Sequence, residues 1–504
     1  MNTPVPHDVF VSVIRDYTFD KDTLRSLSLV SRSFCEIAQR VLFRKVNIFH
    51  ETKLTYGNIR ENGDVLPPFK WEKLEFLARS ARILGYIRVL VVLITYDERH
   101  PVQVYDAYWQ EAGGRAILNT LDQWLPPALE RMTSLEILAY SGPPIQAAIH
   151  QAILRNKTIR RLRANVATHC SVPCKEALQN SDSGAIDDLE FEEIGNEREV
   201  FGFKPFSIGP RRCAFLSHMI ITHSSSLRTI TVPMSLLYDA LMSSRDFPEF
   251  PHLSSLLIED SKFSQALREK RPAWSAAVLP FIIHTHSTIK ILQWGRDMVE
   301  DMTKQVRGTQ FPNLETFSGY GIRHLIQTCS PRRLRIVTLC PDDFDSDSGW
   351  SLLRETSSCL LDLSVLSIST SLRSILIPLD ACTFSNISEL WYEELPDCMI
   401  DEDPYKTNDG RFPLDFIHTV LPALHKLQLL VLTLKGRKEL KLSVFEGYGK
   451  IELSSSPSLC QLTVQLLFYS NQTLYRFDAQ RKDPQSDWIY TSSHGIENLL
   501  DFVL

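Results

Sequence analysis

A short pattern recurs along most of the 504-residue chain and constrains its fold more than any other feature. An apolar residue is followed by two variable residues, a leucine or other apolar residue, one variable residue and a further apolar residue. Examples are "SLEILAY" from Ser134, "SLRTITV" from Ser226 and "TIKILQW" from Thr288. Thirteen copies have their first apolar residue at positions 87, 135, 159, 186, 227, 253, 289, 314, 334, 363, 387, 427 and 459. One copy would occur by chance in a chain rich in leucine, but thirteen indicate a repeat.

The spacing of the copies predicts the architecture. Their steps run from 20 to 48 residues, and most lie near the ~20–29 residues of a leucine-rich repeat. Apolar segments with helical spacing precede several copies, namely "RCAFLSHMIITH" (212–223), "AAVLPFIIHTH" (276–286) and "PLDFIHTVLPALH" (413–425). One helix and one short strand per copy predict an α/β fold. We expect residues 71–504 to form a curved, leucine-rich-repeat-like solenoid with a parallel sheet on its concave side.

The first 48 residues show a different pattern, which predicts three short helices. The segment "VPHDVFVSVIRDY" has apolar residues along one helical face, and "DKDTLRSLSLV" supplies a second helix with Asp20 or Asp22 as its N-cap. Ser31 or Ser33 begins the third helix, where Ser33 and Glu36 have capping-box spacing. Residues 49–70 are expected to be a linker. The sequence thus predicts a helical domain at 1–48 ahead of the repeats.

This N-terminal segment, "VPHDVFVSVIRDYTFDKDTLRSLSLVSRSFCEIAQRVLFRKVNI", resembles an F-box, and its second half is similar to the version common in fungal F-box proteins. In that family the F-box docks onto the Skp adaptor of a Skp/cullin/F-box ubiquitin ligase, and C-terminal repeats capture the protein to be ubiquitinated. The resemblance therefore implies a Skp-type adaptor, and through it a cullin ligase, as partners. Val5 stands where the family has leucine. The positions that the resemblance assigns to adaptor binding are Val5, Pro6, Val9, Val13, Ile14, Leu24, Leu27, Val30 and Phe34.

Composition excludes several other classes of protein. The net charge is −6, with acidic and basic residues mixed along the chain, so the sequence favours neither nucleic acid nor an anionic membrane as a partner. The longest apolar runs are far short of the ~18 residues that a membrane-spanning helix needs. The first residues lack the pattern of a secretion signal, and the scattered cysteines lack that of a disulfide framework. We therefore expect an intracellular protein, in the cytoplasm, the nucleus or both.

Motifs for bond chemistry are missing from the sequence. It contains no Gly-rich phosphate loop, no Gly-x-Ser-x-Gly, no His-Glu-x-x-His and no kinase signature. His284 with His286, and Cys170 with Cys174, lie at unrelated places, so we expect no metal site and no cofactor. Acidic stretches at 341–349 and 401–410 lack the order of calcium ligands and are expected to be solvated loops. The sequence predicts a protein without catalytic residues.

A candidate recognition surface follows from the repeat. If each copy forms a strand, its first, fourth and sixth residues point inward and its third and fifth point outward. The outward positions that could bind a peptide-like segment of a target are Arg161, Arg163, Asp188, Glu190, Thr229, Thr231, Glu389 and Trp391. Charged residues at such positions often serve only solubility, so Trp391 is the best single candidate.

The sequence thus leads to one main hypothesis and two alternatives. The main one is a non-catalytic, substrate-recognition subunit of a Skp/cullin/F-box ubiquitin ligase, acting in ubiquitin-dependent protein degradation on an unknown target protein. The first alternative is a repeat-based protein-interaction scaffold outside a ligase, whose F-box-like helices only cap the repeats. The second is a hydrolase with an unrecognised site, which the missing nucleophile motifs disfavour.

Overall fold

The structure of the chain is a computed structural model, and it has two compact units, Met1–Phe281 and Ile282–Leu504. The structure describes residues 21–52, 72–96, 112–142, 145–166, 185–193, 214–234, 237–238, 241, 249–259, 271–294, 311–319, 334–339, 362–370, 386–394, 424–436, 458–468, 473–483, 486 and 489–496. The first predicted helix, residues 53–70 of the predicted linker and the helical segment at 413–423 lie outside these residues. The predicted boundary at residue 48 is wrong, because a strand (Lys45–Thr52) runs through it and includes the first residues of the expected linker.

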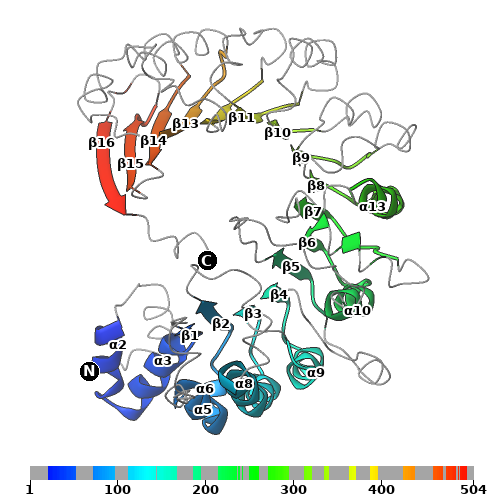
Figure 1. Cartoon of the computed structure of the whole chain (residues 1–504). Coiled ribbons are helices and arrows are strands. Elements are labelled where there is room, and N and C mark those ends of the chain that lie inside the picture. The colour runs from blue at the N-terminus through cyan, green and yellow to red at the C-terminus, as the bar shows by residue number, and fades with distance from the viewer. Residues whose placement is uncertain are drawn as a thin grey trace, which may run out of the picture. The chain divides into compact units, whose positions relative to one another are not determined.

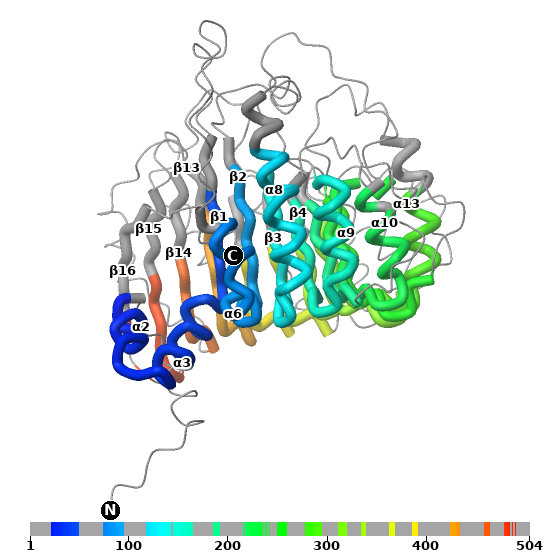
Figure 2. The backbone as a smooth tube through the Cα atoms, turned by 90° about the horizontal axis from the view of Figure 1, so that it is seen from below, coloured from blue at the N-terminus to red at the C-terminus, as the bar shows by residue number. Residues whose placement is uncertain are grey.

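The first unit is a parallel sheet with helices on one side. Its strands are β1 (Lys45–Thr52), β2 (Val89–Tyr96), β3 (Ile137–Gly142), β4 (Arg161–Val166), β5 (Asp188–Glu193), β6 (Thr229–Pro233) and β7 (Ser255–Glu259), each paired in parallel with the next. Its helices are α2 (Lys21–Ser28), α3 (Arg32–Leu42), α5 (Glu72–Arg79), α6 (Ala81–Leu84), α8 (Ala112–Arg131), α9 (Ala147–Arg155) and α10 (Ala214–His223). Figure 1 shows α8, α9 and α10 on the same side of the strands, and Figure 2 shows α8 and α9 side by side.

The second unit continues the strand pattern. Helix α13 (Arg271–Thr285) crosses the boundary between the units, and it precedes β8 (Ile291–Trp294), β9 (Thr316–Gly319), β10 (Ile336–Leu339), β11 (Val365–Thr370), β12 (Glu389–Glu394), β13 (Leu429–Gly436), β14 (Gln461–Phe468), β15 (Thr473–Gln480) and β16 (Ile489–Ile496). Strands β8 to β14 pair in parallel, each with the next. Strands β14, β15 and β16 pair antiparallel, which the repeat pattern did not predict.

The motif and the strands coincide from β2 to β14. Each strand from β2 to β14 begins two residues after the first apolar residue of a copy, as Val89 does after Ile87. All thirteen of these first residues are at most 2% exposed. Every fourth residue of a copy, from Leu90 to Leu462, is at most 1% exposed. These positions form the core, so the prediction of a mixed α/β fold with a mainly parallel sheet is confirmed.

A ladder of backbone hydrogen bonds joins successive strands at the second position of the motif. The carbonyl oxygen of Arg44 accepts from the N–H groups of Arg88 and Val89, at 2.9 and 3.0 Å. The carbonyl of Arg88 accepts in the same way from Glu136 and Ile137, at 2.8 and 3.0 Å. This arrangement repeats along both units and satisfies backbone groups just before each strand starts. The ladder fixes the register of each strand on its neighbour.

The polar residue just before a copy often bonds to the preceding repeat. Ser226 donates its hydroxyl to the carbonyl of Ile186 at 2.8 Å, and the Asn313 amide donates to the carbonyl of Ser287 at 2.7 Å. Asn156, three residues before the copy that begins at Ile159 and 7% exposed, donates to the carbonyls of Leu129 and Met132, at 2.7 and 3.1 Å. These bonds satisfy turn carbonyls and explain the frequent Ser, Thr and Asn before the motif.

Two strands end on a glycine that the packing requires. Gly142 and Gly319 have φ of +150° and +136°, where other L-residues are strained. A Cβ atom at Gly319 would also collide with the carbonyl oxygen of Trp294 in the neighbouring strand. The absence of a side chain at Gly319 therefore lets Trp294 stay 1% exposed, with its ring 5.1 Å from that of Phe317.

Among the helices that the structure describes, none combines the length and apolar character that crossing a membrane requires.

Candidate functional site

Helices α2 and α3 form a small helical pair with its own core. The hydroxyl of Ser31 accepts from the N–H of Phe34 at 3.2 Å and caps α3, as one of the two predicted caps. The predicted capping box of Ser33 and Glu36 is wrong, because Ser33 lies inside α3 and Glu36 pairs with Arg40 at 2.7 Å. The core consists of Leu24, Ile37 and Ala38, with Leu27, Phe34, Val41 and Leu42 packed against it.

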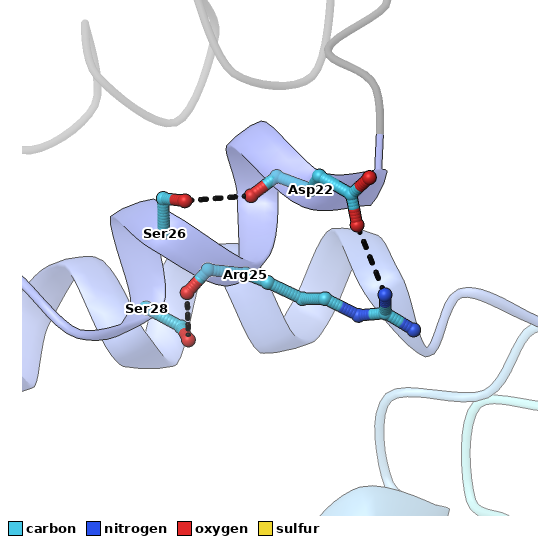
Figure 3. Close-up of polar contacts among 4 residues, drawn as sticks. All are labelled: Asp22, Arg25, Ser26 and Ser28. Carbon is cyan, nitrogen blue, oxygen red and sulfur yellow. Dashed lines mark hydrogen bonds and ion pairs between the residues drawn. The ribbon is translucent and has the colours of Figure 1, made fainter.

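The polar residues of α2 are bonded to their own helix, as Figure 3 shows. Ser26 and Ser28 donate their hydroxyls to the carbonyls of Asp22 and Arg25, at 2.9 and 2.6 Å. Arg25 pairs with Asp22 at 3.0 Å. Asp22 therefore lies in the first turn of the helix, and Asp20 lies outside the described residues. These local bonds leave the opposite, apolar side of α2 for packing.

The turn between α2 and α3 exposes two adjacent apolar side chains. Leu29 is 87% exposed and Val30 is 66% exposed. The N–H groups of both residues bond back to α2, Leu29 to Ser26 and Val30 to Leu27, each at 3.1 Å. The turn is thus held in a defined conformation while its side chains face solvent. Such an apolar pair on a small helical unit is a candidate contact with a partner protein.

The structure places the predicted adaptor-binding residues in three groups. Leu24 is buried in the helical pair, Leu27 and Phe34 are half-buried, and Val30 is exposed. Leu24 therefore supports the pair rather than offering a surface. The remaining predicted residues, Val5, Pro6, Val9, Val13 and Ile14, lie outside the described residues. Leu29, which the pattern of the family did not single out, is the most exposed large apolar residue that the structure describes.

The third and fifth motif positions form what we call the open face of the sheet. On this face, the sequence predicted a basic strip beside an acidic one, and the structure brings them together in β4 and β5. Arg161 pairs with Asp188 at 3.0 Å and with Glu190 at 3.3 Å, and Arg163 pairs with Glu190 at 3.1 Å. Glu190 is central, with its side chain only 16% exposed. The four charges compensate one another, so the cluster is a specific but electrically balanced surface.

Burial has the largest effect on the pKa of Asp188, one of the two carboxylates in this cluster. Burial raises the pKa of Asp188 above its usual range, although the neighbouring Arg161 lowers it, and Asp187 raises it further. The attraction from Arg161 is therefore weaker than the desolvation of the carboxylate. We infer that the ion pair of Asp188 contributes less to stability than its 3.0 Å distance suggests.

The other predicted target-binding residues lie on the open face of their own strands. Thr229 and Thr231 in β6 are half-buried and stand in register with Asp188 and Glu190. Glu389 and Trp391 belong to β12 of the second unit, where Trp391 is 43% exposed and donates its indole N–H to Glu389 at 3.4 Å. The structure thus supplies two separate candidate surfaces, one in each unit.

Three buried histidines between α9 and α10 were not predicted from the sequence. His150 is fully buried, with its Nε2 3.1 Å from the Nδ1 of His218 and its ring 4.6 Å from that of Phe215. Burial, and then the charges of His218 and His223, lower the pKa of His150 to about 3, and burial lowers that of His218. His150 is therefore neutral at pH 7, and one of the two bonded nitrogens donates while the other accepts.

A metal site is not formed by the residues that the structure describes. These residues include no group of three or more His, Cys, Asp or Glu side chains that could hold an ion. Of the residues considered from the sequence, His284 is exposed and His286 is half-buried, while Cys170 and Cys174 lie outside the described residues.

No protein-family model and no curated protein sequence matches this chain.

Proposed function

We propose that this chain is a substrate-recognition subunit of a Skp/cullin/F-box ubiquitin ligase. The observation that carries the proposal is the exposed turn at Leu29 and Val30, in a small helical pair that leads into the first strand of the repeat sheet. Only two residues separate the end of α3 at Leu42 from the start of β1 at Lys45. An adaptor bound at the turn would therefore be closely tethered to the repeats.

In this proposal the repeats form a leucine-rich-repeat-like solenoid that presents its open face to a target protein. Its recurring strand and ladder geometry supports that assignment. The chain would contribute no bond chemistry. It would act by proximity, because holding target lysines near the conjugating enzyme raises their effective concentration. The setting of such a complex would be the cytoplasm, the nucleus or both.

The first experiment is coexpression of the full chain with a Skp adaptor, followed by size-exclusion chromatography. We expect a stable one-to-one complex. The double variant Leu29→Glu/Val30→Glu should lose it while remaining folded, because both side chains already face solvent. Ile489→Glu is the matched control, since Ile489 in β16 is 68% exposed and lies far along the chain from the helical pair.

A second candidate is a protein-interaction scaffold in which α2 and α3 only cap the sheet. The direct passage from α3 into β1 favours such a cap, because the first strand of a repeat array needs protection. A folded chain that elutes without the adaptor would replace the ligase proposal with this one. If the Leu29→Glu/Val30→Glu variant still forms the complex, the adaptor binds at a place other than the turn.

A further inference from the structure

Five basic residues meet where the first two strands begin. We call Arg40, Arg44, Lys45, Arg82 and Arg88 the basic corner; Arg44, Lys45, Arg82 and Arg88 are exposed. The carbonyl of Arg44 accepts from the N–H of Arg88 at 2.9 Å, and Lys45 stands in register with Val89. The backbone ladder therefore brings these residues together from segments more than forty positions apart in the chain.

Tyr86 holds the other two cations of the corner. Its hydroxyl is 3.0 Å from the Nε of Arg82, which donates to it, and its ring centroid is 5.6 Å from the guanidinium carbon of Arg40. A tyrosine that orients two arginines reduces the side-chain entropy that a ligand would otherwise have to restrict. The corner is thus partly preorganised.

The corner carries more positive charge than its neighbours neutralise. Glu36 pairs with Arg40 at 2.7 Å and also acts on the charge of Arg82, and Glu136 pairs with Arg88 at 3.1 Å. Within the described parts of the chain, no carboxylate forms an ion pair with Arg44, Lys45 or Arg82. The whole chain has a net charge of −6, so this excess of cations is local.

We propose that the basic corner binds an acidic peptide segment of a partner protein. The positive charge of the corner calls for a negatively charged ligand. Because the basic corner is small, it favours a short peptide over a nucleic acid. Along the ladder, the corner is followed by Glu136 and, after Arg160, by Asp187. A long polyanion that continued past Arg88 would meet these carboxylates, whereas a short acidic segment would not. The corner does not include the Leu29 and Val30 turn, so this proposal goes beyond the adaptor proposal.

The test uses a fluorescein-labelled, glutamate-rich peptide and the full chain, with binding followed by fluorescence anisotropy. We expect the peptide to bind, the matched glutamine peptide not to bind, and the affinity to fall as salt is added. Arg44→Glu/Arg82→Glu should weaken binding at least about tenfold, since it reverses two cations that no described carboxylate pairs with. Arg44→Gln/Arg82→Gln should give an intermediate loss.

Arg335→Glu is the matched control. Arg335 is exposed and occupies the same ladder position in the second unit, but its ladder neighbours are Glu315 and Ser364. Equal binding by the wild type and Arg44→Glu/Arg82→Glu, or a similar loss in Arg335→Glu, would overturn the proposal. The proposal would also be overturned if the chain bound a single-stranded oligonucleotide or an anionic vesicle but did not bind the acidic peptide. Adaptor copurification should survive Arg44→Glu/Arg82→Glu, which separates this result from failure of the ligase proposal.

Discussion

The open faces of the two units differ, although the strands beneath them are built alike. At β4 and β5 of the first unit this face carries four charges joined by three ion pairs. From β8 to β11 of the second unit it is uncharged, and its members are Ile291, Gln293, Thr316, Ser318, Ile336, Thr338, Val365 and Ser367. Ile291 is 40% exposed and Ile336 is 36% exposed. The repeat fixes the buried positions and leaves the outward ones free to vary in chemistry.

The largest expected effects are losses of stability from leucine-to-alanine changes in the core. They test whether equivalent buried positions of the two units contribute equally to stability. Leu162 and Leu390 occupy the fourth motif position in β4 and β12 and are fully buried. Leu162→Ala and Leu390→Ala should each lower the free energy of unfolding by about 2–5 kcal/mol, because each leaves a cavity. Urea titration of the full chain measures the loss. Leu257→Ala is the control, since Leu257 is half-buried on the open face of β7. If Leu390→Ala costs no more than this control, the similarity of the two cores is refuted.

The buried histidines should make the stability of the first unit depend on pH. The pKa of His150 is about 3 when folded and near 6.5 when unfolded, so the unfolded chain binds more protons between these values. Stability should therefore be fully present above about pH 6.5 and decrease by up to about 1.4 kcal/mol per pH unit as the pH falls toward 3. His150→Leu should flatten this decrease in thermal melts from pH 7.5 to 4.5, although His218 still contributes.

His284→Leu serves as the comparison for that experiment. His284 is exposed and belongs to the second unit. Its replacement should leave the dependence of melting temperature on pH as it is in the wild type. An equally steep decrease in His150→Leu would show that other groups control the response to acid.

A smaller effect compares two glutamates on the open face, Glu190 in β5 and Glu389 in β12. Glu190→Gln removes the carboxylate that both Arg161 and Arg163 contact, and should cost about 1 kcal/mol at low salt and less at high salt. Glu389→Gln should cost at most a few tenths of a kcal/mol, because among the described residues Glu389 accepts a single 3.4 Å bond, from Trp391. Urea titrations at two salt concentrations compare the variants. Equal losses would show that the ion pairs of Glu190 contribute no more to stability than the single hydrogen bond of Glu389.

Trp391 and Trp294 should differ in how much they contribute to stability. This side chain is 43% exposed, so Trp391→Ala should cost less than about 1 kcal/mol. Trp294 is 1% exposed, and Trp294→Ala should cost about 3–5 kcal/mol. Thermal melts of both variants test the contrast. A large loss in Trp391→Ala would mean that this tryptophan supports the fold and is a poor candidate for recognition.

The repeat was predictable because its signal is local and occurs many times. Each copy needs apolar residues at three positions of a six-residue segment, and all first and fourth positions are buried in the structure. Helices α10 and α13 were predicted as well, because each is an apolar segment directly before a copy of the motif. The ion pairs between β4 and β5 followed from alternation along strands whose starts were known.

Other features have no such local signal. Strands β15 and β16 lack the leucine motif, and their antiparallel pairing depends on contacts with β14 rather than on a helical spacer. In β1, the alternation of Val46 and Ile48 gave a signal, but it lay inside the segment that resembled an F-box. His150 and His218 lie in different helices and are 68 positions apart in the chain, so only the fold brings them together.

The backbone ladder has a consequence for how a chain like this can change over evolution. The same two hydrogen bonds join β2 to β3 and β9 to β10. The segment that connects the first pair of strands is long, and the segment that connects the second pair is short. The register of the strands is therefore independent of the length of the connecting segment, and an insertion in that segment need not disturb any strand. New loops can be gained or lost at one rim of the sheet while the inherited scaffold keeps its alignment, so loop length is free to diversify between relatives.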